Sequence, residues 1–183
     1  MRIIAGSLKG RRLETPDWEG LRPTSDRLRE TLFNVLAPRI DGARLLDGFA
    51  GTGAIGIEAL SRGAAHVTFV ERDARAVRLM ERNLERAGLG RERHVIIRAD
   101  LAVAVRRLAT QPFDIIVLDP PYGAPQLTAS LTAIEPVVGA ETVLVVEHAR
   151  RDGAPPQHGA LERTREITSG DSSLAFYRSQ RRS

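Results

Sequence analysis

The sequence has no cysteine, a single lysine and no long run of apolar residues. The missing cysteines exclude disulfides, thiolate zinc sites and cysteine nucleophiles, so a metal site would need histidine and carboxylate ligands. No run approaches the roughly 18 apolar residues of a membrane span, and the first residues carry too short an apolar stretch for a secretory signal. We therefore expect a cytoplasmic protein with no membrane partner and no metal ion.

Size and composition argue against disorder and against several domains. The 183 residues are 42% hydrophobic and 27% charged, which is ordinary for a globular protein. Domains commonly hold about 100 to 200 residues, so the chain is long enough for one domain and short for two. We predict a single domain over residues 1–183 that acts as a monomer.

Both ends of the chain are basic and free of acids. There are 27 lysine and arginine residues against 23 acids, and only Lys9 is a lysine. Arg11 and Arg12 precede the first acid, Glu14, and the residues after Asp171 carry arginines without an acid. Such patches attract phosphate backbones, but a merely solvated surface has the same count. Charge alone leaves nucleic-acid binding open.

Residues 1–40 form an extension that precedes the main pattern. Two short extended pieces within 2–15, with glycines between them, predict a hairpin. Apolar residues recur at i, i+4, i+7 and i+8 from Leu28, which predicts an amphipathic helix. We expect Thr24 to cap this helix and Pro38 to end it.

From residue 41 onward, strand and helix patterns alternate, which is typical of an open α/β sheet. The strands lack polar alternation, so they suit a parallel sheet that is buried on both faces. The last two strands have no helical stretch between them, which predicts an antiparallel pair at one edge, and residues 154–160 are expected to be a loop. Ligands of such sheets bind beyond the carboxyl ends of the strands. We predict strands near 44–49, 66–71, 94–100, 113–119, 142–148, 161–168 and 173–178, and helices near 54–62, 73–87, 101–109 and 126–135.

A glycine-rich loop follows the first of these strands. Gly51, Gly53 and Gly56 have the spacing GxGxxG, and Glu71 ends the next strand 20 residues after Gly51. Small residues let the backbone approach a nucleotide-type ligand, and a carboxylate at the strand end can accept both ribose hydroxyls. The spacing alone also fits a dinucleotide dehydrogenase, or tight packing of a helix on the sheet.

One aspartate, Asp47, favours S-adenosyl-L-methionine over a dinucleotide, and a second, Asp100, is placed to contact an adenine. Asp47 lies four residues before Gly51, where its charge would repel a pyrophosphate but attract the ammonium and sulfonium groups of a methionine portion. Asp100 follows the third strand and can accept a hydrogen bond from the adenine amino group, with Leu101 beside the ring. Asp100 also fits a simpler role as the cap of the helix near 101–109.

A second motif, Asp119-Pro120-Pro121-Tyr122, directly follows the fourth strand. The two prolines make this turn rigid. An exocyclic amine of a nucleobase is a poor nucleophile because its lone pair is delocalised into the ring. If Asp119 and the Pro120 carbonyl accept its two N–H bonds, the lone pair can turn toward a methyl donor while Tyr122 stacks on the base. A base inside a duplex cannot reach such a turn, so the target must be unpaired or flipped out.

With DGFAGTG, the strand-end acids and DPPY in this order, residues 41–178 resemble a class I S-adenosylmethionine-dependent N-methyltransferase. The stretches RIIAGSLKGRRL and LRPTSDRLRETLFNVL resemble the N-terminal part of the RsmD family, the 16S ribosomal RNA guanine-N2 methyltransferases. The resemblance implies a Rossmann-like, seven-stranded mixed α/β sheet, mostly parallel with one antiparallel edge strand. An N-terminal hairpin and helix over 1–40 would precede a catalytic core over 41–183. The implied substrate is the N2 amine of a guanine, guanine 966 by resemblance, in 16S rRNA or an assembling small ribosomal subunit.

The resemblance also assigns roles to individual residues. Thr24 and Arg27 would form a lid over cofactor and substrate, or else a solvated helix face, and Arg11 and Arg12 would contact the RNA. His148 could reach the cleft from the end of its strand. The cofactor would be held by Asp47, Phe49, Gly51, Gly53, Glu71, Asp100 and Leu101, and the reaction site would be formed by Asp119, Pro120, Pro121 and Tyr122.

Other activities fit parts of the same pattern. The proline turn could serve a DNA adenine N6 amine or a protein glutamine amide, and the glycine loop could serve a dehydrogenase. A non-catalytic RNA-binding or assembly module would keep the fold and bind no cofactor. The complete set of strand-end acids together with the intact turn favours the methyltransferase.

Overall fold

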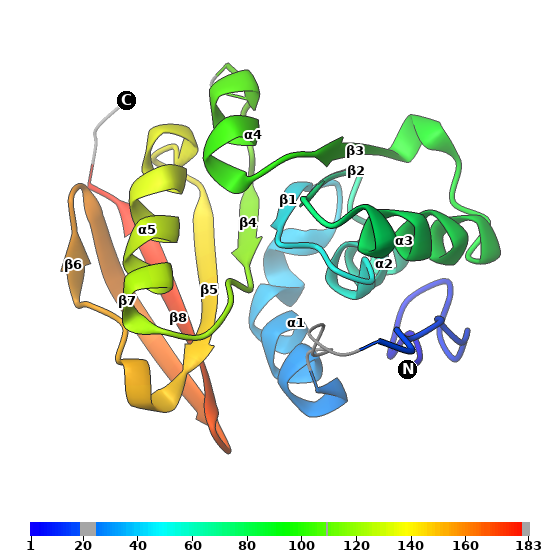
Figure 1. The fold of residues 1–183 in the computed structure, drawn as a ribbon, viewed down its shortest axis with the longest axis horizontal. Helices are drawn as coiled ribbons and strands as arrows, with labels where there is room; N and C mark the ends of the chain where they lie inside the picture. Colours follow the sequence, from blue (N-terminus) through cyan, green and yellow to red (C-terminus); the bar gives the residue numbers. More distant parts are fainter. Residues whose placement is uncertain (19–24, 109, 181–183) are drawn as a thin grey trace.

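A computed structural model of the chain describes residues 1–18, 25–108 and 110–180. Its centre is an eight-stranded sheet with the order β3-β2-β1-β4-β5-β8-β7-β6 (Figure 1). The strands are β1 (Arg44–Gly48), β2 (His66–Glu71), β3 (His94–Arg98), β4 (Ile115–Leu118), β5 (Val143–Ala149), β6 (Gln157–His158), β7 (Leu161–Ser169) and β8 (Ser172–Ser179). The helices are α1 (Asp26–Ile40), α2 (Ala54–Ser61), α3 (Ala74–Arg86), α4 (Leu101–Leu108) and α5 (Ala124–Ile134), with short 3-10 turns at Arg91–Arg93, Glu135–Val137 and Arg150–Asp152.

The parallel half of the sheet sets the position of the site. β1 pairs in parallel with β2 on one side and with β4 on the other. β3 extends the sheet beyond β2, and β5 extends it beyond β4, again in parallel. From β1 the chain proceeds to β2 and β3 on one side, and it then returns to β4 and proceeds to β5 on the other side. The direction of progression reverses between β1 and β4, so their carboxyl ends lie at a topological switch point. Open α/β sheets bind their ligands at this point.

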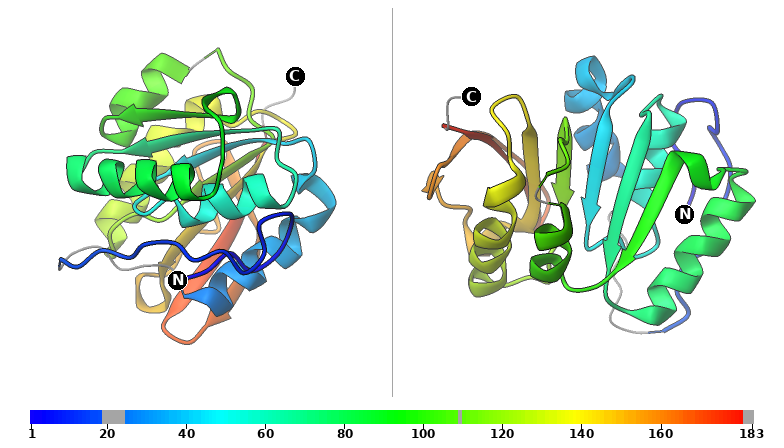
Figure 2. Two further views of the ribbon diagram at one scale, coloured as in Figure 1. Left: turned by 90° about the vertical axis from the view of Figure 1, so that its right-hand side faces the viewer. Right: turned by 90° about the horizontal axis from the view of Figure 1, so that it is seen from above.

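Helices cover both faces of the sheet (Figure 2). α1, α2 and α3 bury Leu32, Ile57 and Met80 against one face. α4 and α5 bury Val105 and Leu131 against the other. Every residue of β4 is buried, as expected for a strand that contacts helices on both sides. This double burial explains why the central strands are apolar without alternation.

The non-parallel end of the sheet differs in detail from the prediction. The antiparallel strand predicted at the edge is β8, which lies inside the sheet between β5 and β7. Residues 154–160 were expected to be a loop, but Gln157–His158 pair with β7 and form the eighth strand, β6, at the edge. A two-residue strand has no alternation to detect in sequence, so this expectation and the strand count of seven were wrong.

The first helix also begins and ends differently from the prediction. Its N-cap is Ser25, whose side-chain oxygen accepts a hydrogen bond from the Leu28 amide at 3.2 Å. Thr24, the predicted cap, lies outside the described residues. The helix continues past Pro38 to Ile40, because a proline in the last turn removes only one hydrogen bond of the helix.

The N-terminal extension is fastened to α2. The predicted hairpin is reduced to one antiparallel bridge between Arg2 and Arg12. The buried Glu58 carboxylate accepts hydrogen bonds from the amides of Ile4 at 2.8 Å and Ala5 at 3.0 Å. The extension therefore lies on the face covered by α1 to α3, behind the glycine loop.

Candidate functional site

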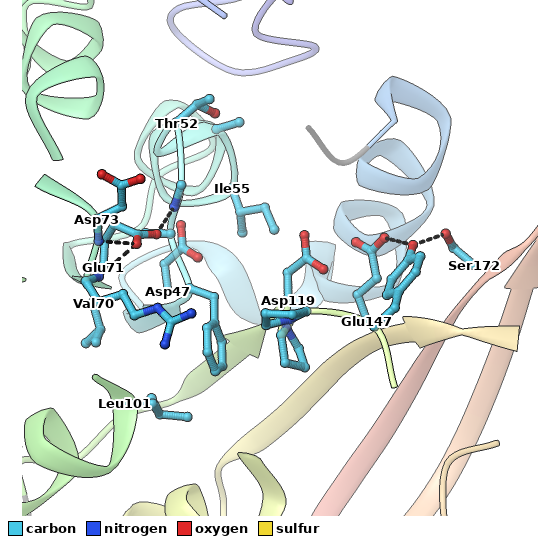
Figure 3. A pocket seen from close by; sticks show the side chains of 18 of the residues that line it. Asp47, Thr52, Ile55, Val70, Glu71, Asp73, Leu101, Asp119, Glu147 and Ser172 are labelled. Carbon is cyan, nitrogen blue, oxygen red and sulfur yellow. Dashed lines mark hydrogen bonds between the residues drawn. The ribbon is translucent and has the colours of Figure 1, made fainter. Parts of the chain in front are cut away.

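A cavity of about 570 Å³ opens at the carboxyl ends of β1, β2, β4 and β5 (Figure 3). It contains both sequence motifs, although they are separated by about seventy residues of chain. Of the predicted site residues, Gly53, Arg11, Arg12 and Arg27 are not among those that line it. The predicted residues that do line it are Asp47, Phe49, Gly51, Glu71, Asp100, Leu101, Asp119, Pro120, Pro121 and Tyr122.

The glycine loop turns sharply between β1 and α2. Phe49 has φ of 65°, a left-handed conformation that side chains other than glycine rarely adopt, and Gly53 begins the helix with φ of 79°. A Cβ atom on Gly56 would overlap the Phe69 ring of β2. Gly53 and Gly56 therefore let α2 start abruptly and lie close to the sheet, which brings the loop backbone into the cavity wall.

Asp47 is a buried acid at the floor of this loop. Its carboxyl is 1% exposed, and one oxygen accepts the Gly56 amide in the first turn of α2 at 2.9 Å. Burial raises the pKa of Asp47 to about 7, against the hydrogen bond from Gly56 and with the help of the negative charge of Glu71. Because no cation within the described part of the chain contributes to its pKa, a positively charged ligand in the cavity would stabilise its ionised form.

Glu71 is held almost rigidly at the end of β2. One carboxylate oxygen accepts the Gly51 amide at 2.9 Å, and the other accepts the amides of Arg72 and Asp73, both at 2.8 Å (Figure 3). Three backbone donors on a single carboxylate fix its orientation toward the glycine loop. Glu71 is thus preorganised to present oxygen acceptors to a ligand.

Asp100 is more exposed than the other two acids. Its carboxylate lies 3.4 Å from the Arg72 guanidinium, an ion pair at the surface. Its backbone carbonyl accepts the amides of Val103 and Ala104, so Asp100 also begins α4. The adjoining Leu101 side chain is buried at the wall of the cavity. Both of the alternatives considered for Asp100 are compatible with this position.

The proline turn forms the opposite corner of the cavity. The Asp119 amide donates to the Gly48 carbonyl at 3.3 Å, which joins the turn to the end of β1. The Tyr122 hydroxyl lies 2.7 Å from the Ser172 hydroxyl and donates to the Glu147 carboxylate at 3.3 Å (Figure 3). The orientation of the Tyr122 ring is therefore set by β5 and β8.

Glu147 and Ser172 were not predicted from the sequence, from which only the neighbouring His148 was considered at this strand end, with a structural role as the main expectation. Successive side chains of a strand point to opposite faces, so Glu147 lines the cavity and His148 does not. His148 is 2% exposed and approaches Glu166 of β7 to 3.0 Å on the other face. The suggestion that His148 reaches the cleft was wrong. The acid at the end of the segment VLVVE was the available signal for Glu147. The sequence alone does not show which face of the sheet this side chain occupies, because that depends on the register of β5 with its neighbours.

Of the two predicted lid residues, Thr24 lies outside the described residues and Arg27 is not among the residues that line the cavity; the residue of this segment that does line it, Ser25, was not predicted. Arg27 is exposed on α1. Arg11 is exposed too, and it donates to the Arg86 carbonyl at 3.2 Å. Arg12 is exposed beside it. These arginines form a surface near the extension and take no part in the cavity wall.

Asn83 is a further residue that was not predicted from the sequence. It is fully buried in α3, donates to the Thr52 carbonyl of the glycine loop at 3.0 Å and accepts the Glu14 amide at 2.7 Å. Its amide group also donates to the Glu14 carbonyl at 3.2 Å. Asn83 thereby links the N-terminal extension to the ligand-binding loop.

The described ranges contain neither a membrane-spanning helix nor a cluster of metal ligands. None of the helices there combines the length and apolar character needed to cross a membrane. No group of three or more histidine and carboxylate side chains in those ranges is arranged to hold a metal ion. The absence of a metal from the function stays a prediction.

Comparisons with known proteins agree with this geometry. The family described as "Conserved hypothetical protein 95" matches residues 1–178. Ribosomal RNA small subunit methyltransferase D of Escherichia coli K12 is 37% identical over 179 residues, 97% of this chain and 89% of that protein. YlbH of Bacillus subtilis is 40% identical over 97% of this chain and 98% of that protein. The solved structure of yhhF from Escherichia coli matches with a TM-score of 0.83 and 35% identity, covering 100% of this chain and 99% of that one.

Proposed function

The chain belongs to the RsmD family of methyltransferases, and we propose that it methylates the N2 amine of a guanine in 16S ribosomal RNA, using S-adenosyl-L-methionine. The name of the Escherichia coli relative supports ribosomal RNA as the substrate class. The resemblance of the sequence motifs supports guanine N2, and guanine 966 in particular. A single catalytic domain over residues 1–183, a monomeric state and a cytoplasmic location belong to the same proposal.

One observation carries the proposal: the Asp119–Tyr122 turn and the acids of the glycine loop line the same cavity. A methyl donor at the loop and an amine at the turn would then be neighbours. Holding two reactants in this way removes much of the entropic barrier to their reaction. The main tasks of the chain are to bind, orient and exclude water.

The residues at the glycine loop fit S-adenosyl-L-methionine. Asp47 offers a buried anion for a cationic methionine portion, and Glu71 offers fixed acceptors for ribose hydroxyls. Asp100 lies at the rim, where an adenine amino group would find an acceptor. The cofactor, when bound, supplies a methyl group activated by its positively charged sulfur. A pyrophosphate beside these acids would be repelled, which disfavours a dehydrogenase.

The residues at the proline turn fit an exocyclic amine. Asp119 and the Pro120 carbonyl are acceptors, and they would bind the two N–H bonds of the amine and leave its lone pair directed at the donor. An amine that accepted a methyl group would gain positive charge, which the Asp119 carboxylate would stabilise, and it would then lose one N–H proton toward the acceptor that binds it. Tyr122 provides an aromatic face for the base, and its hydroxyl contacts keep that face in one orientation.

Mapping the modified nucleotide by mass spectrometry tests the proposal. Unmodified small subunits, naked 16S rRNA, duplex DNA and a glutamine-containing protein are incubated with the enzyme and methyl-labelled cofactor. We expect N2-methylguanine at one position of 16S rRNA. Label in DNA adenine or in protein glutamine, with none in rRNA, would contradict it. Calorimetry that detects no affinity for the cofactor would favour the non-catalytic module.

A further inference from the structure

The reaction corner contains a second carboxylate beside Asp119. β4 and β5 are parallel neighbours in which Leu118 is opposite Val146. The next residues along these two strands are Asp119 and Glu147, and both line the cavity. Figure 3 shows both carboxylates turned toward the same side of the sheet. Two acids thus lie at adjacent strand ends where the acceptor base would bind.

The proposed chemistry leaves Glu147 without a direct role. The cofactor acids belong to β1, β2 and the loop after β3, whereas Glu147 lies on β5, beyond the proline turn. Glu147 is only 5% exposed. Removing a carboxylate from water is unfavourable, so a buried one at a cavity wall indicates a ligand or structural requirement. The Tyr122 hydroxyl donates to this carboxylate at 3.3 Å, which places it beside the residue expected to stack on the base.

The hydrogen-bond donors of guanine match a pair of neighbouring carboxylates. Its Watson–Crick edge presents the N2 amine next to N1–H, so two donors lie side by side. An ionised carboxylate is an acceptor only. Adenine, by contrast, has a bare acceptor nitrogen at N1 beside its N6 amine, and this lone pair would face a carboxylate without a proton between them. A carboxylate at that position favours guanine and rejects adenine by repulsion.

We propose that Glu147 selects guanine by accepting a hydrogen bond from its N1–H, while the neighbouring Asp119 holds the N2 amine. This inference rests on the proposed function. Ser172 and Tyr122 have a supporting part. The 2.7 Å contact between their hydroxyls holds the Tyr122 ring, which defines the plane of the base whose edge the two carboxylates contact. Selection of guanine then comes from Glu147 on β5, Ser172 on β8 only holds the Tyr122 ring, and methyl transfer comes from the turn after β4.

The test compares guanine with 2-aminopurine at the methylated position. 2-Aminopurine keeps the reacting amine but has an acceptor at N1 in place of the donor. Ligated 16S rRNA with either base, reconstituted into small subunits, is the substrate. For the parent protein we expect kcat/KM for guanine to exceed that for 2-aminopurine by at least about 100-fold.

The informative variant is Glu147→Gln. Its amide oxygen can still accept the Tyr122 hydroxyl, and its NH2 group can donate to N1 of 2-aminopurine. We expect the preference for guanine to fall at least tenfold, chiefly through a gain on 2-aminopurine. Ser172→Ala serves as the matched control, because loosening Tyr122 should slow both substrates equally and leave the ratio unchanged.

The outcomes separate this inference from the function on which it rests. If the parent methylates guanine and Glu147→Gln lowers both rates by the same factor, Glu147 only positions Tyr122 and the inference is overturned. If the parent methylates no rRNA guanine, the proposed function fails and the inference fails with it. Unchanged cofactor affinity and melting temperature of Glu147→Gln show that a changed ratio arises at the base.

Discussion

The two halves of the cavity are held together by different kinds of contact. On the cofactor side, Asp47 and Glu71 bond to backbone amides of the glycine loop and of the start of α3. On the acceptor side, Tyr122 is oriented by the side chains of Glu147 and Ser172. Backbone donors keep their positions whatever the neighbouring side chains are, whereas the acceptor side depends on particular residues. The first half therefore suits a common cofactor, and the second suits a selected base.

The largest expected effect comes from a substitution that disrupts only the acceptor side of the cavity. Asp119→Ala removes the acceptor of the amine, and we expect turnover on rRNA to fall by about 1,000-fold, the scale of losing one preorganised electrostatic group. Cofactor affinity, measured by calorimetry, should stay within about threefold, because the cofactor side does not use this residue. Asp119→Asn keeps one acceptor oxygen, so its turnover should lie between that of the parent and that of Asp119→Ala. Turnover of Asp119→Ala close to the parent would refute the role.

The next effect concerns the cofactor side and depends on pH. The pKa of Asp47 in the folded protein is raised to about 7 from its ordinary 3.8. Between these values the folded state keeps a proton that the unfolded state has lost, so the stability of the ligand-free protein falls as pH rises from about 4 to about 7 and then levels off.

Cofactor affinity should change in the opposite direction. A cationic ligand favours ionised Asp47, so affinity should rise by up to about tenfold per pH unit below about 7 and be flat above it. Calorimetry from pH 5 to pH 7 on the parent and on Asp47→Asn measures this, since the variant has no proton to lose there. Equal slopes for the two proteins would remove Asp47 from cofactor binding.

A third effect tests whether backbone geometry defines the cofactor side. A Cβ on Gly56 would overlap the Phe69 ring, so Gly56→Ala must push α2 away from the sheet. We expect the free energy of unfolding to fall by about 1 to 3 kcal/mol, with weaker cofactor binding. Gly139→Ala is the matched control, because its Cβ would meet only the Thr142 hydroxyl at 3.3 Å. Equal melting temperatures for the two variants would refute the packing argument.

The contrast between the halves also explains what the sequence could predict. The glycine loop, Glu71 and Asp119 lie within one strand–turn segment each, so a local pattern was enough to predict them as site residues, and the structure brings them to one cavity. Glu147 and Ser172 reach Tyr122 from 25 and 50 residues away. Such contacts depend on strand register, which local pattern does not encode.

The same limit applies to two other features. Asn83 joins Thr52 to Glu14 across 31 and 69 residues. Its position seven residues after Ala76 and three after Met80 lies on the buried face of α3, which was the available signal for burial, but its two partners are too distant in sequence for a local pattern to indicate them. The two-residue strand β6 owes its pairing to β7 and has no pattern of its own. Elements with strong local periodicity were predicted to within a few residues. Burial of one helical face produces an apolar period of about 3.6 residues, and burial of a whole strand produces a continuous apolar run.

The smallest expected effect lies outside both halves. Arg11 and Arg12 are exposed on the extension, and if they contact phosphates they add attraction without contributing to base selection. Replacing both with glutamine should weaken rRNA binding severalfold and reduce the slope of log K against log salt by about 0.7 per lost contact. The ratio of guanine to 2-aminopurine methylation should not change, in contrast to Glu147→Gln.

The matched control is the double glutamine variant of Arg106 and Arg107, an exposed pair on α4 across the sheet. Equal losses for the two double variants would show that only net charge matters, whereas a loss confined to the extension would make it the surface that faces the RNA.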